Sequence, residues 1–163
     1  MSTAMQEAFA KVGVMKPEKT PWNPSRKATA RVKGALPAPT TCPHCGSEVE
    51  LCSNAKIYGR EYGDWPWAYR CTDDDCNSYV GVHPFTNIPL GTLATFEMRE
   101  ARKEAKAEFN PIWQSRQMTR SEAYAWLAGK LGIPVGECHI GWFDEDQCER
   151  VIEVCQQRKG GKA

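Results

Sequence analysis

Two short cysteine motifs constrain the fold of this chain more than any other feature of its sequence. The first is CPHCG at residues 42–46, and the second is a pair of cysteines separated by four residues. A CPxCG turn directs two thiolates toward one point, and its glycine permits the backbone conformation that follows the second sulfur. The 25 residues between Cys45 and Cys71 are enough for a pair of strands to leave one cysteine turn and return to the other. Because Zn²⁺ binds four thiolates as a tetrahedron, the sequence predicts a zinc ribbon with one zinc ion and four ligands, Cys42, Cys45, Cys71 and Cys76.

The four-cysteine set favours a structural ion, since four thiolates complete the coordination shell and leave no open position for catalysis. The second pair has a wider spacing than the C-x2-C usual in ribbons, so His83 is an alternative fourth ligand in place of Cys76. Buried thiols or disulfides are the other interpretation of these cysteines. His44 lies between two ligands, and we expect its side chain to point away from the metal.

The rest of the composition places the chain in a reducing compartment. It has eight cysteines but no recognisable secretory leader, and no run approaches the roughly 18 apolar residues of a membrane helix. We therefore expect a cytoplasmic protein without a membrane partner, in which clustered cysteines bind metal rather than form disulfides.

Charge is distributed unevenly, although the net charge is only +1. Residues 1–41 hold seven Lys/Arg and two acids, and residues 42–93 hold three Lys/Arg and seven acids. Prolines interrupt residues 1–40, so we expect a disordered basic N-terminal arm there. Such an arm gains from counterion release on a phosphate backbone, and four of its residues are candidate nucleic-acid contacts: Arg26, Lys27, Arg31 and Lys33. A solvated tail without a fixed partner is the alternative.

The predicted ribbon spans residues 41–92, and alternating patterns suggest its strands. We expect them at residues 48–51, 55–61, 67–70 and 78–83. This region is rich in aromatic residues, and Trp65 and Trp67 are candidates for stacking on bases. The competing interpretation is structural, since a small metal module needs large rings to bury enough apolar area.

Three helices are expected after the ribbon. A connecting helix in residues 93–116 starts at Thr92 or Thr95 and stops near Phe109, before Asn110-Pro111. A helical pair follows in residues 117–158, with a tail at 159–163. Each helix of the pair begins with a capping-box pattern, Thr119-x-x-Glu122 and Asp144-x-x-Gln147. The fold class is therefore α+β: a zinc-ribbon β-module followed by a three-helix region.

The later cysteines are interpreted as structural. Cys148 and Cys155 fall on the apolar stripe of the last helix, where a free thiol packs as a small apolar group. Cys138 and His139 are adjacent in an extended segment and should point to opposite sides, so they do not suggest a catalytic pair.

Several motifs in fixed order resemble those of a bacterial and phage family called the zinc-finger-containing domain, catalogued as a domain of unknown function. They cover residues 40–156 and run CPHCG, IYGREYG, WPWAYRC, YVGVHP, LGTLA, FNPIW, SEAYAWLAGKLGI and CHIGWFDEDQC. The resemblance implies zinc bound by the same four cysteines, and a bacterial cell or a phage-infected host as the setting. It implies no reaction.

Two non-catalytic functions remain open, and an enzyme, such as a nuclease, is less favoured than either. The first is a nucleic-acid-binding module that contacts DNA or RNA. The second is an adaptor or inhibitor that binds a host protein of the transcription or defence machinery through the acidic ribbon. We found no nucleotide-binding or catalytic fingerprint that favours an enzyme, and the sequence indicates no oligomeric state.

Overall fold

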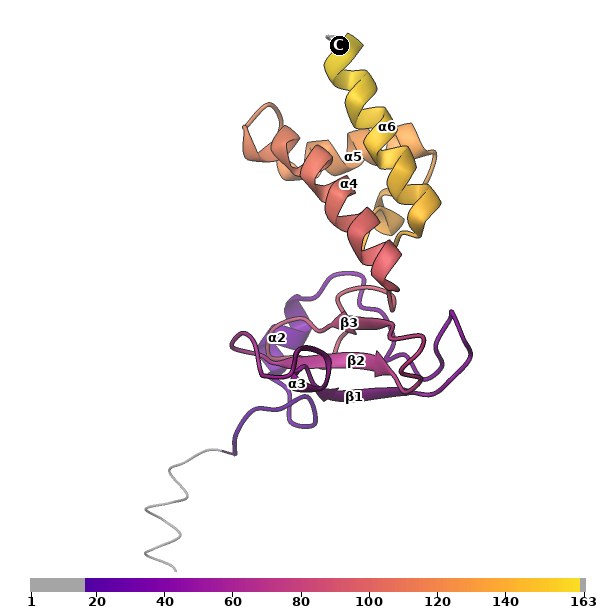
Figure 1. Ribbon diagram of the computed structural model, residues 1–163. Helices are drawn as coiled ribbons and strands as arrows, with labels where there is room; N and C mark the ends of the chain where they lie inside the picture. Colours follow the sequence, from indigo (N-terminus) through magenta and orange to yellow (C-terminus); the bar gives the residue numbers. More distant parts are fainter. Residues whose placement is uncertain (1–16, 162–163) are drawn as a thin grey trace, which may run out of the picture.

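The computed structural model describes residues 17–161, and within them a small sheet lies at one end and three long helices at the other (Figure 1). The strands are β1 (Val49–Ser53), β2 (Trp67–Cys71) and β3 (Tyr79–Gly81). They form an antiparallel sheet in the order β1-β2-β3, with Val49 opposite Cys71 and Ala68 opposite Gly81. The predicted α+β class is confirmed.

The outer edge of β3 is covered by the chain itself. Tyr79 and Ala94 exchange backbone hydrogen bonds of 3.2 and 3.1 Å, and the Leu90 amide donates to the Gly81 carbonyl at 2.9 Å. The segment that leads to the helices therefore occupies the position of a fourth strand.

The strand predicted for residues 55–61 is wrong, because a one-turn helix, α3 (Ala55–Tyr58), begins there. The side chain of Asn54 closes this loop, since it donates to the Tyr62 carbonyl at 3.0 Å and accepts from the Tyr62 amide at 3.1 Å. Gly59 then ends the helix with φ of 85°. These hydrogen bonds between residues eight positions apart outweigh the alternating pattern that suggested a strand.

The predicted arm has more structure than its composition suggested, in the part that is described. Residues 1–16 lie outside the described residues. Helix α2 (Arg26–Arg31) begins at the N-cap Ser25, whose amide donates to the Phe85 carbonyl at 2.8 Å. Trp22 packs edge-on against Trp67, with ring centroids 5.2 Å apart. The N-terminal segment is therefore anchored to the strand module at Trp22 and Ser25.

The three long helices are α4 (Phe96–Gln114), α5 (Arg120–Leu131) and α6 (Glu145–Gly161), and the single-turn helices η1 (Val135–Glu137) and η2 (Ile140–Trp142) connect the last two. The predicted end of the first helix at Phe109 is wrong, because α4 continues through Pro111. Proline removes one helical hydrogen bond, but the turn that follows it buries Ile112 against the helical core. The free energy gained by burying Ile112 offsets the helical hydrogen bond lost at Pro111.

The core between the helices includes the apolar stripe that the sequence predicted for the last helix. Its buried residues include Phe109, Leu127, Phe143 and Val151, together with three cysteines. Burial raises the pKa of each of these thiols to about 11, so they are neutral at physiological pH: Cys138, Cys148 and Cys155.

Both predicted capping boxes are present. The Glu122 amide donates to the Thr119 hydroxyl and the Thr119 amide to the Glu122 carboxylate, each at 3.1 Å. Asp144 and Gln147 make the same reciprocal pair at 2.8 and 3.1 Å. Within residues 17–161, no helix has both the length and the apolar character needed to cross a bilayer.

The two halves meet at a tight backbone contact. Thr92 donates its amide to the Gly141 carbonyl at 3.2 Å, and a Cβ on Gly91 would lie only 1.9 Å from that carbonyl oxygen. The Arg102 guanidinium donates two hydrogen bonds at the same joint, one to the Phe143 carbonyl at 2.8 Å and one to the Thr92 carbonyl at 2.9 Å. The joint fixes α4 relative to the sheet.

Candidate metal centre and the placement of the basic residues

The sulfur atoms of the four predicted ligands gather at one point at the edge of the sheet. All of them lie within 4.8 Å of one another. Cys45 Sγ is 3.4 Å from Cys71 Sγ, and Cys42 Sγ is 3.7 Å from Cys76 Sγ. A tetrahedral zinc ion with Zn–S bonds of about 2.3 Å separates its sulfurs by about 3.8 Å. The cluster therefore has the size that one zinc ion requires.

The first cysteine turn positions its sulfurs through backbone hydrogen bonds. The Gly46 amide donates to the Cys42 carbonyl at 2.9 Å, and the His44 amide points at Cys42 Sγ at 3.4 Å. Gly46 has φ of 78°, a conformation that glycine adopts without strain. This is the role that the CPxCG pattern predicted for it.

The second turn reproduces the same arrangement despite its wider spacing. The Asp73 amide points at Cys71 Sγ at 3.4 Å, as His44 does at Cys42. The Asn77 amide donates to the Asp73 carbonyl at 3.0 Å, and Asn77, like Gly46, has a positive φ, of 48°. The Asp73 carboxylate also accepts from the Asp75 amide at 2.9 Å. The two additional residues are thus absorbed within the turn, and Cys76 reaches the cluster.

Ionised thiolates packed this closely would be stabilised by a cation between them. Burial raises the pKa of the Cys71 thiol to about 12, whereas hydrogen bonds from Ser47 lower that of the exposed Cys45 thiol to about 7. Four thiolates this close repel one another unless a positive ion lies between them. The donor set fits one structural zinc ion, and all eight cysteines, every one of them within the described residues, are free of disulfides.

The histidines near the first turn and after β3 are not needed as ligands. His44 turns away from the sulfurs as expected, and its Nε2 lies 2.8 Å from the Leu93 carbonyl oxygen. His83 is not a member of the sulfur cluster; its side chain lines a hollow on the side of α4. The four cysteines complete the site without it.

Cys138 and His139 do not form a nucleophile and base pair. Cys138 is buried in the helical core, and burial raises its pKa to about 11. His139 instead stacks on Trp142 with ring centroids 4.0 Å apart, and its Nε2 lies 3.1 Å from the Gly136 carbonyl oxygen. This is the arrangement that the sequence predicted.

The residues predicted to contact nucleic acid lie on the ordered N-terminal segment and in the strand module. Trp65 donates to the Thr86 carbonyl at 2.9 Å, and Trp67 packs against Trp22, so both indoles are partly buried. Four basic side chains in and after α2 are exposed: Arg26, Lys27, Arg31 and Lys33. Their role in binding stays a prediction.

Sequence reasoning missed a second set of basic residues, on α4, because acidic residues alternate with them along the sequence. The basic residues of α4 recur with the spacing i, i+3, i+4 and i+7: Arg99, Arg102, Lys103 and Lys106. At 100° per residue they fall within an arc of about 100°. The acidic residues occupy a separate arc: Glu97, Glu100, Glu104 and Glu108. Sorting the charges by helical position would have revealed this basic row.

Comparison with known proteins found one family. The family described as a zinc-finger-containing domain matches residues 38–158, a span that includes the four clustered cysteines and all three long helices except the end of α6. Neither the curated proteins nor the solved structures gave a match.

Proposed function

Since the chain belongs to the zinc-finger-containing domain family, we propose that it is a non-enzymatic nucleic-acid-binding protein of a bacterial cell or a phage-infected host. The zinc ion has no open coordination position in this proposal. It holds the strand module in shape, because the apolar core beside the cysteines is small and a small core depends on such a cross-link.

The observation that carries the proposal is the set of unpaired cations on the N-terminal segment. Arg26, Lys27, Arg31 and Lys33 are exposed, and none of them forms an ion pair with another described residue. Their segment is anchored to the module through Ser25 and Trp22. Cations held in fixed positions lose less entropy when they contact phosphates than cations on a free tail.

The competing function, an adaptor that docks its acidic surface on a host protein, has support from charge as well. Asp73, Asp74 and Asp75 lie in the second cysteine turn, but Arg70 already pairs with Asp74 and the Asp73 carboxylate accepts from the backbone. These groups are partly used within the protein, whereas the cations are not. We therefore favour nucleic acid.

The test is binding of the full chain to labelled DNA and RNA over a range of salt concentrations. Each phosphate contact contributes a slope of about −0.9 for duplex and about −0.7 for single strands to the plot of log affinity against log salt. Alanine at all four positions of the segment should weaken binding and flatten the slope. The matched control replaces two arginines and two lysines elsewhere on the surface: Arg60, Lys130, Arg150 and Lys159.

Two results would contradict the proposal. If the unaltered chain binds neither DNA nor RNA at low salt, the adaptor function is the better account. If the control variant loses as much affinity as the segment variant, binding depends on net charge alone and the segment has no special role.

A further inference from the structure

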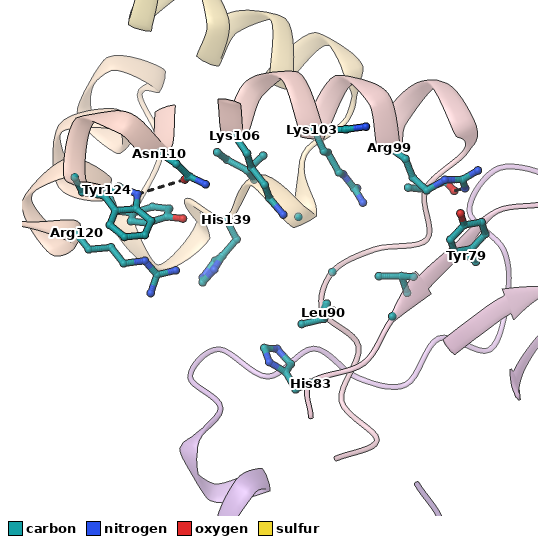
Figure 2. A pocket seen from close by; sticks show the side chains of 18 residues that line it. Tyr79, His83, Leu90, Arg99, Lys103, Lys106, Asn110, Arg120, Tyr124 and His139 are labelled. Carbon is teal, nitrogen blue, oxygen red and sulfur yellow. Dashed lines mark hydrogen bonds between the residues drawn. The ribbon is translucent and has the colours of Figure 1, made fainter. Parts of the chain in front are cut away.

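A groove lies between the helical half on one side and the strand module with its N-terminal segment on the other, and we call it the basic groove. It consists of two adjoining hollows of about 610 and 720 Å³, which share the residues His83, Leu90, Arg120 and His139. Figure 2 shows Arg99, Lys103 and Lys106 projecting from α4 toward the space that His83 and Leu90 border from the other side. Arg31 and Lys33 line the second hollow, so the groove joins the N-terminal segment to α4.

The charge of the basic groove is of one sign. No Asp or Glu is among the residues that line either hollow. None of the basic groove residues forms an ion pair with another described residue. The Lys and Arg residues of the groove are Arg31, Lys33, Arg99, Arg102, Lys103, Lys106 and Arg120. An anionic ligand would therefore meet no carboxylate in the lining and would displace no salt bridge.

A buried arginine forms part of the wall. Arg102 is 7% exposed, and its guanidinium donates to two carbonyls and to the Thr92 hydroxyl, none of which carries a charge. Burial lowers its pKa from the usual value of arginine, yet the group stays charged at neutral pH. Burying this charge is costly. The nearby Asp144 carboxylate offsets part of the cost, and a bound anion beside the guanidinium would reduce it further.

Aromatic rings accompany the cations in the basic groove. The Arg99 guanidinium lies 3.9 Å from the centroid of the Tyr79 ring. Arg120 lies between two rings, 5.4 Å from the centroid of Trp113 and 5.3 Å from that of Tyr124. Rings and guanidinium planes stack on nucleobases, but only where the bases are not already stacked in a duplex.

The shape of the basic groove argues against a peptide as the occupant. A bound peptide strand usually gains its affinity from hydrogen bonds to a free sheet edge. Here the edge of β3 is already paired with residues Leu90 and Ala94. The groove offers charges and rings instead of backbone donors, which suits phosphates and bases.

We propose that the basic groove is a binding track for single-stranded nucleic acid, with phosphates on Lys103, Lys106 and Arg31 and bases against the rings beside Arg99 and Arg120. This inference rests on the proposed function and adds the strandedness and the path of the ligand. The joint of Gly91 with Gly141 keeps the two walls in a fixed position, so the track is formed before the ligand arrives.

The experiment compares an oligothymidine of about 20 nucleotides with a duplex of the same length, by fluorescence anisotropy. The unaltered protein should bind the single strand about tenfold more tightly than the duplex, since only the single strand offers free base faces. Lys103→Ala/Lys106→Ala should weaken single-strand binding roughly tenfold and reduce the salt slope by about 1.4, the value for two phosphate contacts.

The matched control is Lys130→Ala/Lys159→Ala, which removes the same charge from exposed positions outside the basic groove. It should bind within about twofold of the unaltered protein. We expect both variants to fold, because the substituted positions are exposed. Measurements of zinc content and of Tm that match the unaltered protein will check this.

Four outcomes would overturn the inference. If the duplex binds as tightly as the single strand, the proposed function stands but the strandedness is wrong. If both double variants bind alike, nucleic acid binds elsewhere. If polyglutamate displaces the oligothymidine as well as unlabelled oligothymidine does, the groove recognises charge without bases and an acidic peptide becomes its ligand. If the protein binds no nucleic acid at all, both this inference and the proposed function are wrong.

Discussion

Replacing Gly91 by alanine tests whether the joint between the sheet and the helices is as tight as its geometry indicates. A Cβ at this position would lie 1.9 Å from the Gly141 carbonyl oxygen and 2.7 Å from its carbonyl carbon. Both are backbone atoms, so no side-chain rotation relieves the contact. Gly91 does not have a positive φ, so the effect of the substitution is steric.

The expected loss of stability follows from how far the two backbones must move apart to admit the Cβ atom. Real Cβ atoms stay at least 3.0 Å from such atoms, so the two backbones must separate by more than 1 Å. Inserting a methyl group into packed structure costs about 1–3 kcal/mol, and a backbone-to-backbone clash belongs at the upper end. The shift would also stretch the hydrogen bond from the Thr92 amide to the Gly141 carbonyl. For a chain of this size, each kcal/mol lowers Tm by about 2–4 °C.

The assay is thermal and urea unfolding of Gly91→Ala beside the control Gly129→Ala. Gly129 lies exposed in α5, and nothing is within 4 Å of a Cβ built there. Alanine should therefore stabilise the control by up to about 1 kcal/mol through helix propensity. If Gly91→Ala unfolds at the same urea concentration as the unaltered protein, the joint is looser than the structure indicates and the fixed walls of the basic groove are not established.

Three further predictions follow from the core, the metal centre and a helix cap. Leu127→Ala should cost about 2–5 kcal/mol in urea unfolding because the side chain is fully buried; a change below about 0.5 kcal/mol would show that it is not packed. Cys42→Ser and Cys76→Ser should each lose zinc in metal analysis, and a Cys76 variant with stoichiometric zinc would exclude that ligand. Hydrogen bonds from Thr119 lower the pKa of the Glu122 carboxyl below its usual 4.5. The stability that this capping box contributes is therefore present above pH 4.5 and is lost as the pH falls through the folded-state pKa. Thr119→Ala should be less stable than the unaltered protein at neutral pH, and equal stability of the two proteins there would refute the capping box.

Much of the metal centre was predictable from local sequence. The CPxCG turn and the second cysteine pair identified four side chains that the structure brings within 4.8 Å of one another. Local patterns also predicted the capping boxes at Thr119 and Asp144 and the strand β2. These features depend on residues a few positions apart, which is why one sequence is enough to find them. How the wider second turn accommodates its extra residues, through the hydrogen bonds of Asp73, came only from the structure.

Local patterns failed where distant contacts decided the outcome. Proline should have ended α4 near Phe109, but the burial of Ile112 in the helical core carried the helix onward. Alternation suggested a strand after β1, but the two hydrogen bonds between Asn54 and Tyr62 closed a loop instead. In both cases the free energy of a contact absent from the local window exceeded a local preference.

The sequence by itself therefore determined the cysteine set that fits zinc, the fold class and the apolar stripe of the last helix, because spacing and periodicity encode them directly. Tertiary structure alone decided that the N-terminal segment lies against the module and that its cations join those of α4 in one groove. Arg31 and Lys106 are 75 positions apart in the chain, and no periodicity relates them. Their shared surface exists because the backbones of Gly91 and Gly141 meet and hold the sheet against the helices.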